Sequence, residues 1–230
     1  MSVQILEDIP VQYDLARLSK ELQLERLRGR IDEVDQLIED SYELLDPKAL
    51  YIYLQVQEIS GFTVRLETGD IVNGAILTDK IKCTQTISPY VVTIGSRLEE
   101  MSSQLSNTNL LKAWLLDGIG NHALTIVLDY VQKIVEEKLK GTVSNFNPGS
   151  GSGEFFGVDQ QKVIFRILSP EDKIGVRLTQ DYLMIPRKSV SGIFASTEEK
   201  YIACQHCPRK KCDSRKVPFK GEYRPAHAHE

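Results

Sequence analysis

The sequence lacks the features that mark secreted, membrane-spanning or nucleic-acid-binding chains. No basic stretch followed by an apolar core stands at its start, as a signal peptide would require. No uncharged apolar run approaches the roughly 18 residues of a membrane span. With a formal net charge of -4, the chain also lacks the basic excess of a general nucleic-acid surface. We expect a cytoplasmic protein whose partners include no membrane and no nucleic acid, and whose four cysteines are thiols or metal ligands.

Internal repeats and long linkers are absent as well. The 230 residues suit one large domain or two small ones, and no segment is long enough to force a division. The sequence therefore predicts a single domain over residues 1–217, with a helical part over about residues 1–48. A polar, flexible tail is predicted over residues 218–230.

What the sequence does contain is a mixture of helical and strand-like patterns. An apolar stripe at helical spacing runs from Ile31 to Leu45, and Pro47 ends it. The pattern then alternates over residues 50–57 and again over residues 62–66, around a Ser-Gly pair. This alternation predicts two half-buried strands joined by a tight turn.

A long helical pattern over residues 109–139 divides the chain. Gly118 and Gly120 weaken its middle, so we expect a kink or a close backbone contact there. Residues 143–157 are rich in glycine and predict a turn, and residues 159–168 predict a short helix. Further strand patterns cover residues 71–81, 90–94, 175–178, 182–185 and 190–195. Because helices and strands do not alternate regularly, a mixed α+β fold with an antiparallel sheet fits better than a parallel sheet.

The glycine-rich stretch over residues 145–165 reads NFNPGSGSGEFFGVDQQKVIF. Glycines let a backbone approach a ligand closely, and a following helix N-terminus can hold anionic groups. The stretch is no P-loop, because no Gly-Lys-Ser/Thr follows, and its context is too poor in strands for a dinucleotide fingerprint. Composition alone leaves a surface turn and a ligand-binding loop both open.

From this stretch onward the sequence resembles the C-terminal half of the reactivation domain of cobalamin-dependent methionine synthase. That family carries a motif of the type RPAxGYPACPDH, then a helix, a strand containing Ser-Val-Ser-Gly, and Lys-Tyr-Tyr-Ala. The corresponding segments here are NPGSGSGEFFGVDQQ, Ser189–Gly192 and Lys200–Ala203. An Asn/Ser-Pro-Gly form of the first motif is typical of stand-alone relatives of the domain. The resemblance covers residues 145–203 and is looser before them.

The resemblance implies an α+β fold with a bent antiparallel sheet and flanking helices. It also implies that the chain binds S-adenosylmethionine in a shallow groove and docks over cobalamin held by a partner. In the family, an electron donor reduces the oxidised corrinoid, and the methyl group of S-adenosylmethionine then traps it in the methylated form. The domain's task is to hold the methyl sulfonium close to cobalt, which is a positioning task.

Motif position gives the residues that the resemblance assigns to cofactor binding, which are Asn147, Pro148, Gly149, Ser150, Gly151 and Tyr201. Asn147 stands where the family has an arginine, so a cation that can hold the methionine carboxylate is missing. Phe155 or Phe156 can replace the tyrosine of the motif as an aromatic wall. Ser189–Gly192 is either part of the site or a structural strand signature.

Three of the four cysteines, Cys204, Cys207 and Cys212, lie within nine positions of one another. The Cys-x-x-Cys pair places two thiolates on one tight turn, which suits zinc or an iron–sulfur cluster. His206 and Cys83 are candidate fourth ligands. A structural metal site, an iron–sulfur cluster that delivers the reducing electron, and free or redox-active thiols are all open interpretations. The basic residues around the cluster form either a solvated face or a docking surface for an acidic partner.

Together these features predict reactivation of the corrinoid of a cobalamin-dependent methionine synthase, or of a related corrinoid methyltransferase, by reductive methylation. The chain would act as a separate subunit, as a component of the methyltransferase without a complete active site of its own. Its partners would be the corrinoid protein and a reductase. The alternative is a metal- or iron–sulfur-binding redox accessory protein of corrinoid metabolism that has no methyl-donor site. A third hypothesis is an interaction module that shields the corrinoid.

Overall fold

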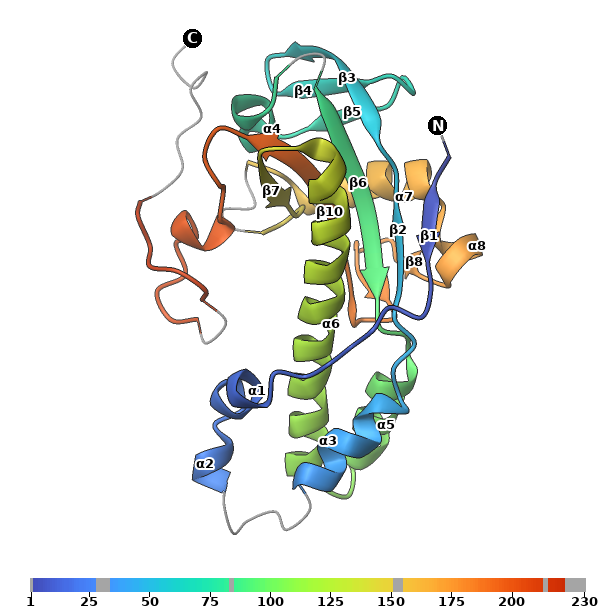
Figure 1. Ribbon diagram of the computed structural model, residues 1–230, viewed down its shortest axis with the longest axis vertical. Coiled ribbons are helices and arrows are strands. Elements are labelled where there is room, and N and C mark those ends of the chain that lie inside the picture. The colour runs from blue at the N-terminus through green and yellow to red at the C-terminus, as the bar shows by residue number, and fades with distance from the viewer. Residues whose placement is uncertain (1, 28–33, 83–84, 151–154, 213–214, 222–230) are drawn as a thin grey trace.

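The computed structural model describes residues 2–27, 34–82, 85–150, 155–212 and 215–221. Within them, eight strands form one antiparallel sheet, and helices pack on both of its faces (Figure 1). This arrangement confirms the α+β fold with a bent antiparallel sheet and flanking helices. No helix in these residues is long and apolar enough to cross a membrane, and the cytoplasmic location stays a prediction.

The elements follow one another in a mixed order. The strands of the sheet are β1 (Gln4–Leu6), β2 (Lys48–Tyr51), β3 (Leu54–Ser60), β4 (Thr63–Leu66), β5 (Ile71–Asn73), β6 (Thr86–Thr93), β7 (Thr142–Phe146) and β10 (Ser189–Thr197). A separate hairpin consists of β8 (Arg177–Leu178) and β9 (Met184–Ile185). The helices are α1 (Leu15–Glu21), α2 (Leu24–Leu27), α3 (Val34–Tyr42), α4 (Ala75–Lys80), α5 (Arg97–Leu105), α6 (Leu110–Leu139), α7 (Gln161–Leu168) and α8 (Pro170–Ile174), with short 3-10 turns η1 (Val158–Gln160) and η2 (Ala203–Gln205).

Strand β6 lies in the centre of the sheet. It pairs with β2 and β3 along one edge and with β10 along the other, and β10 in turn pairs with β7. Its side chains alternate between two apolar clusters. Ile87 and Val91 enter one cluster, and Tyr90 and Val92 enter the other. Strand β6 is therefore buried on both faces, which explains why apolar side chains follow one another without alternation at Tyr90, Val91 and Val92.

The two apolar clusters lie on opposite faces of the sheet. Helix α6 runs along one face and packs there with α1, α3 and α5, while α4, α7 and α8 pack on the other (Figure 1). Asn109 caps α6 by accepting a hydrogen bond from the Lys112 N–H at 3.0 Å, at the start that the sequence predicts. The helix then continues without a break to Leu139.

The two glycines of α6, Gly118 and Gly120, allow close contacts with the helix backbone, which is one of the two outcomes that the sequence predicts for them. A Cβ atom at Gly118 would lie 2.2 Å from Cδ2 of Leu22, and one at Gly120 would lie 2.8 Å from Cδ2 of Leu98. These positions let α1 and α5 approach the backbone of α6. Next to Gly120, the buried ammonium group of Lys188 forms an ion pair with Asp117 at 2.7 Å, which ties the chain before β10 to the helix.

Several predicted boundaries are wrong for identifiable reasons. The strand predicted over residues 50–57 is split into β2 and β3 opposite Pro89. The Pro89 carbonyl accepts a hydrogen bond from the Ile52 N–H, but proline has no N–H that could donate the second hydrogen bond of the pair. Residues 71–81 contain β5 followed by α4, with Gly74 between them. The predicted turn over residues 143–157 begins with strand β7. The hairpin at Ser60 is confirmed, because Ser60 pairs with Thr63.

Other elements carry no clear signal in the sequence. Strand β1 and helices α5 and α8 were not predicted, since each is short and only partly apolar. The helix predicted over residues 31–45 corresponds to α3, and its first three predicted residues lie outside the described part of the chain. Residues 222–230 of the predicted tail lie outside it as well.

Candidate functional site

A narrow, shallow depression lies beside the end of strand β7. Its lining comes from α4, from β7 and the loop after it, from the segment before η1 and from the chain after β10, and consists of Ile76, Phe146, Asn147, Ser150, Phe155, Phe156 and Tyr201. Three predicted cofactor-binding residues, Asn147, Ser150 and Tyr201, thus meet at one place, together with both candidate aromatic-wall residues. Pro148 lies in the loop between them, and Gly151 lies outside the described residues.

The loop after β7 is folded back on itself by backbone hydrogen bonds. Gly149 has a φ of +78°, a conformation that glycine adopts without strain, and its N–H donates to the Phe156 carbonyl at 2.7 Å. The N–H and the hydroxyl of Ser150 donate to the Asn147 carbonyl at 3.1 and 2.8 Å. These bonds hold the Phe155–Phe156 segment against Asn147 and so shape the depression.

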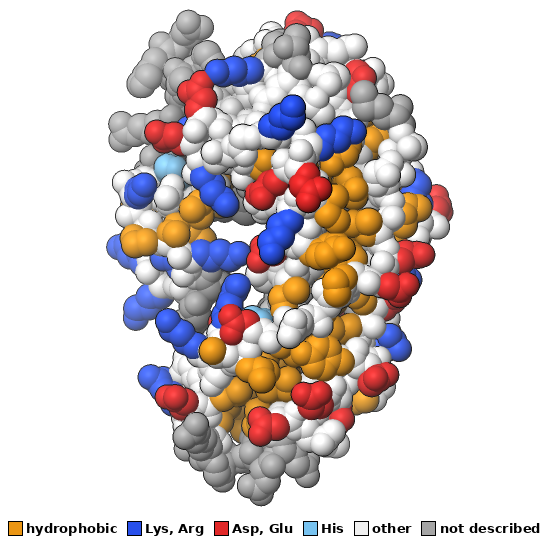
Figure 2. All heavy atoms as spheres, in the orientation of Figure 1, with side chains coloured by type: hydrophobic (Ala, Val, Ile, Leu, Met, Phe, Trp, Pro, Cys, Tyr) orange, Lys and Arg blue, Asp and Glu red, His pale blue; other side chains and the backbone are white. Residues whose placement is uncertain are grey.

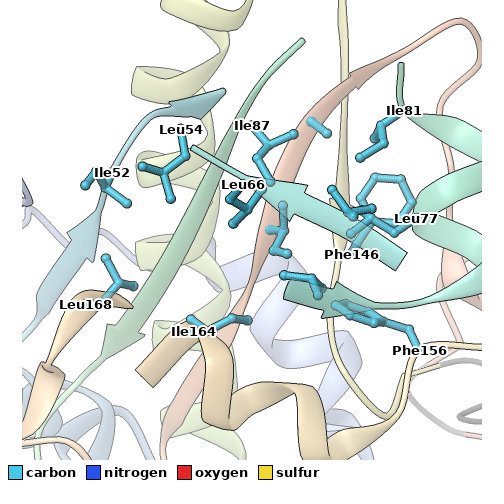
Figure 3. Close-up of a cluster of buried hydrophobic side chains, with 14 of the residues drawn as sticks. Ile52, Leu54, Leu66, Leu77, Ile81, Ile87, Phe146, Phe156, Ile164 and Leu168 are labelled. Carbon is cyan, nitrogen blue, oxygen red and sulfur yellow. The ribbon is translucent and has the colours of Figure 1, made fainter. Parts of the chain in front are cut away.

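Aromatic rings form the floor and one wall of the depression. Phe146 and Phe156 enter the apolar cluster beneath it, between the sheet and helices α4 and α7 (Figure 3). The ring of Tyr201 stacks on Phe146 with the centroids 5.1 Å apart, and on His206 at 5.9 Å. The Tyr201 N–H donates to the Ser144 hydroxyl at 2.8 Å, which attaches the chain after β10 to β7.

Tyr201 is therefore an aromatic surface and not a base. Burial raises the pKa of its phenol to about 12, and the nearby Cys204 and Cys207 add to the rise. The phenol is neutral at physiological pH, and its ring packs in an aromatic stack with Phe146 and His206.

The side chain of Asn147 belongs to a network that surrounds the hydroxyl of Tyr90. Its amide nitrogen donates to the Tyr90 hydroxyl at 2.7 Å and to the Ser191 carbonyl at 2.9 Å. The Tyr90 hydroxyl in turn donates to Oδ1 of Asn145 at 2.9 Å. Burial raises the pKa of Tyr90 far above its ordinary value, although the hydrogen bond that Asn147 donates to the hydroxyl opposes that rise.

The Ser189–Gly192 segment serves both the sheet and the site. The Ser189 hydroxyl donates to the Pro186 carbonyl at 2.7 Å and lies 2.9 Å from the Thr93 hydroxyl, and both are structural contacts at the start of β10. At Gly192, a Cβ atom would lie 2.7 Å from the Asn147 amide nitrogen and 2.8 Å from the Tyr90 hydroxyl. Only a glycine lets these two side chains approach the β10 backbone so closely.

The three described cysteines lie in the loop that follows Tyr201, and each is partly exposed. Arg215 organises this loop, because its guanidinium donates to the carbonyls of Cys204 at 2.6 Å, Cys207 at 3.1 Å and Arg209. In the described part of the chain, no three His, Cys, Asp or Glu side chains are close enough together to hold one metal ion, and Cys83 lies outside that part. The metal-binding role of the cysteines stays a prediction.

Basic side chains gather around the same loop. Figure 2 shows Lys and Arg side chains concentrated at the left of the view, where Figure 1 places the chain after β10. The basic residues of the segment after β10 are Arg209, Lys210, Lys211, Arg215, Lys216 and Lys220. Arg215 is directed to backbone carbonyls, so this part of the basic run is structural.

Sequence reasoning missed the residues that orient the site. Tyr90, Asn145 and Phe146 were not predicted as site residues, although Asn145, Phe146 and Asn147 alternate as polar, apolar and polar at the end of a strand. That period of two was the available signal. It was hidden because the segment was interpreted as the beginning of a glycine-rich turn.

Comparisons with known proteins give a partial sequence match and a similar fold. The sequence model of a family described as "Vitamin B12 dependent methionine synthase, activation domain" matches residues 130–216. Among solved structures, the chain is similar to "Crystal Structure of the MetH Reactivation Domain bound to AdoHcy", with a TM-score of 0.65 and 14% identity, over 88% of this chain and 81% of that one. No curated protein matches the sequence. Residues 130–216 thus resemble in sequence the activation domain of vitamin B12 dependent methionine synthase, and most of the chain is similar in fold to the solved reactivation domain.

Proposed function

We propose that this chain binds S-adenosylmethionine in the depression beside β7 and presents the methyl group to a corrinoid held by another polypeptide. The observation that carries the proposal is the meeting of Asn147, Ser150 and Tyr201 at one depression. All three residues lie in the segment that matches the activation-domain family. The related reactivation domain was solved with AdoHcy, the product that S-adenosylmethionine leaves after methyl transfer.

The residues fit such a ligand in type. Phe155 is only partly buried and packs against the cluster that contains Phe156 and Tyr201, so it can offer an aromatic face to the adenine ring or to the cationic sulfonium. Asn147 and Ser150 offer polar atoms for the amino-acid part. The depression is shallow and encloses essentially no free volume, far below the roughly 300 Å³ at which ligand pockets usually begin. The ligand would therefore lie across the depression, and a partner surface would cover most of it.

This division of labour explains why the chain would have no complete active site alone. When bound, S-adenosylmethionine would supply the methyl group through cleavage of its methyl–sulfur bond, and the partner's corrinoid, reduced by one electron from a reductase, would supply the electron pair for the new bond to carbon. The residues of this chain hold the donor and exclude water from it. They contribute by orientation, which can account for several orders of magnitude in rate.

Residues 1–217 would act together as one functional unit. Strands from Gln4 to Thr197 share a single sheet, which supports this interpretation. The unit would serve as a separate subunit of a methionine synthase, or of a related corrinoid methyltransferase.

The test is reactivation in a defined mixture. A corrinoid methyltransferase with oxidised corrinoid, a reductase, S-adenosylmethionine and the full chain are combined without oxygen, and methylcobalamin is followed by its absorption spectrum. We expect methylcobalamin to form only when the chain and S-adenosylmethionine are both present. Formation at the same rate without the chain contradicts the proposal. A Tyr201→Ala variant, checked for folding by circular dichroism, is expected to slow the reaction at least about tenfold, through the loss of about 1.5 kcal/mol of stacking.

A second candidate function is a metal- or iron–sulfur-binding redox accessory protein. The specific observation in its favour is that Arg215 gathers the carbonyls of Cys204 and Cys207 into one loop that contacts Tyr201 through His206. This candidate predicts a brown protein after anaerobic purification, with an absorption band that is lost in a Cys204→Ser variant. A colourless preparation without iron or zinc contradicts it.

A further inference from the structure

The amide group of Asn147 has only one orientation that satisfies its neighbours. The Ser191 carbonyl can only accept a hydrogen bond, so the group that faces it at 2.9 Å must be the amide nitrogen. The same nitrogen faces the Tyr90 hydroxyl at 2.7 Å, and that hydroxyl passes its own proton to Asn145. Both amide hydrogens of Asn147 are therefore used inside the protein.

The remaining polar atom of this side chain is an acceptor. Among the described residues, no donor is hydrogen-bonded to Oδ1 of Asn147, and the residue lines the depression. The oxygen is not among the buried side-chain atoms that lack a partner in the described chain, so solvent or a ligand can reach it. Asn147 offers a ligand a hydrogen-bond acceptor and no donor.

The charge of the lining points in the same direction. The described lining of the depression contains no lysine and no arginine, so a ligand carboxylate finds no cation there. It contains four aromatic rings and the Asn147 oxygen, which suit a cationic donor. Resting on the proposed function, we infer that Asn147 selects the methyl donor through its ammonium group, and that Tyr90 and Gly192 are positioning residues that fix the Asn147 amide for this task.

Tyr90 and Gly192 fix the orientation of the Asn147 side chain from within the protein. Tyr90 is fully buried, stacked on Phe194 at 4.2 Å, and cannot reach a ligand itself. Its hydroxyl takes one amide hydrogen and so turns Oδ1 outward. Gly192 leaves the space that this arrangement occupies. The Ser-Val-Ser-Gly segment thus contributes to ligand selection through a missing side chain.

The experiment is a calorimetric titration of the full chain with three ligands. These are S-adenosylhomocysteine, its analogue without the amino group, and its inosine analogue, which lacks the amine of the adenine ring. For the wild type we expect removal of the amino group to weaken binding about tenfold or more, because a charge-assisted hydrogen bond is lost. We expect this difference to vanish in Asn147→Leu and to shrink in Tyr90→Phe.

A matched control is Tyr53→Phe, which removes a hydroxyl that does not line the depression. It is expected to retain the full difference between the ligands. Circular dichroism and thermal unfolding show whether each variant folds, and the ligand comparison on the wild type needs no variant. If the deaminated analogue binds as tightly as S-adenosylhomocysteine, the inference is overturned and the proposed function stands. If the Asn147→Leu variant instead abolishes the difference in affinity between S-adenosylhomocysteine and its inosine analogue, the inference is overturned as well. If S-adenosylhomocysteine fails to bind the wild type, the proposed function fails and the inference fails with it.

Discussion

Replacing Gly192 with alanine tests whether strand β10 is built around a close approach. The added Cβ atom would lie 2.8 Å from the Phe146 carbonyl, which is part of the β7–β10 ladder, and 2.7 Å from the Asn147 amide nitrogen. Ordinary van der Waals contact begins near 3.4 Å. The end of β7 must therefore move by about 0.6 Å away from β10.

The magnitude follows from what this movement breaks. Two hydrogen bonds of Asn147, to the Tyr90 hydroxyl and to the Ser191 carbonyl, are lost or lengthened, at about 1 kcal/mol each. Overpacking adds about 1 to 2 kcal/mol. We expect the free energy of unfolding to fall by about 3 to 4 kcal/mol, which lowers the Tm of a chain of this size by about 6–15 °C.

The assay is urea and thermal unfolding followed by circular dichroism. Gly141→Ala is the matched control, because Gly141 has a φ of +75° and a Cβ atom added there would meet nothing within 4 Å. Backbone strain alone should lower its stability by about 1 kcal/mol. A Gly192→Ala variant that is no less stable than Gly141→Ala would show that the close approach at β10 has no energetic consequence.

Three further predictions concern stability. Burial raises the folded-state pKa of Tyr201 from 10 to about 12. The stability of about 3 kcal/mol that this shift represents is fully present below pH 10 and is lost between pH 10 and 12. In urea unfolding, the Tyr201→Phe variant should therefore lose less stability at alkaline pH than the wild type. In the same assay, Lys188→Met should destabilise the protein less than Asp117→Ala does. The methionine removes the buried charge, whereas the alanine leaves the Lys188 ammonium group without its ion pair and should lower the free energy of unfolding by about 2 to 3 kcal/mol. The reverse order of stability would contradict this prediction. Asp14→Ala removes the side chain that accepts from the Arg17 N–H at 3.0 Å at the start of α1, and a loss of about 1 kcal/mol is expected; no loss at all would mean that the cap is exposed to water in both states.

Elements with a strong local signal could be predicted from the sequence. Helix α6 has a long apolar face and an asparagine cap, and its predicted and observed ends nearly coincide. The β3–β4 hairpin has an alternating pattern on both sides of its turn. In both cases the local pattern and the tertiary packing demand the same structure.

Elements defined by their partners could not be predicted as well. Strand β7 reads as the edge of a glycine-rich loop, and only its pairing with β10 makes it a strand. The break between β2 and β3 depends on Pro89, which lies on a neighbouring strand. Such features follow from long-range contacts that a local pattern does not contain.

The same distinction applies to the candidate site. Asn147, Ser150 and Tyr201 could be found through their motif, and the structure brings them together at one depression. Tyr90 could not be found, because its role depends on hydrogen bonds to residues more than 50 positions away. The metal-ligand role of Cys204, Cys207 and Cys212 stays a prediction of their spacing.

The proposed binding site is tested most directly by a crystal structure of the full chain grown with S-adenosylhomocysteine. We expect the ligand to lie in the depression beside β7, with an aromatic contact to Tyr201 and its ammonium group at hydrogen-bond distance from Oδ1 of Asn147. A ligand bound at another place, or a depression that stays empty at millimolar ligand, would contradict the proposal.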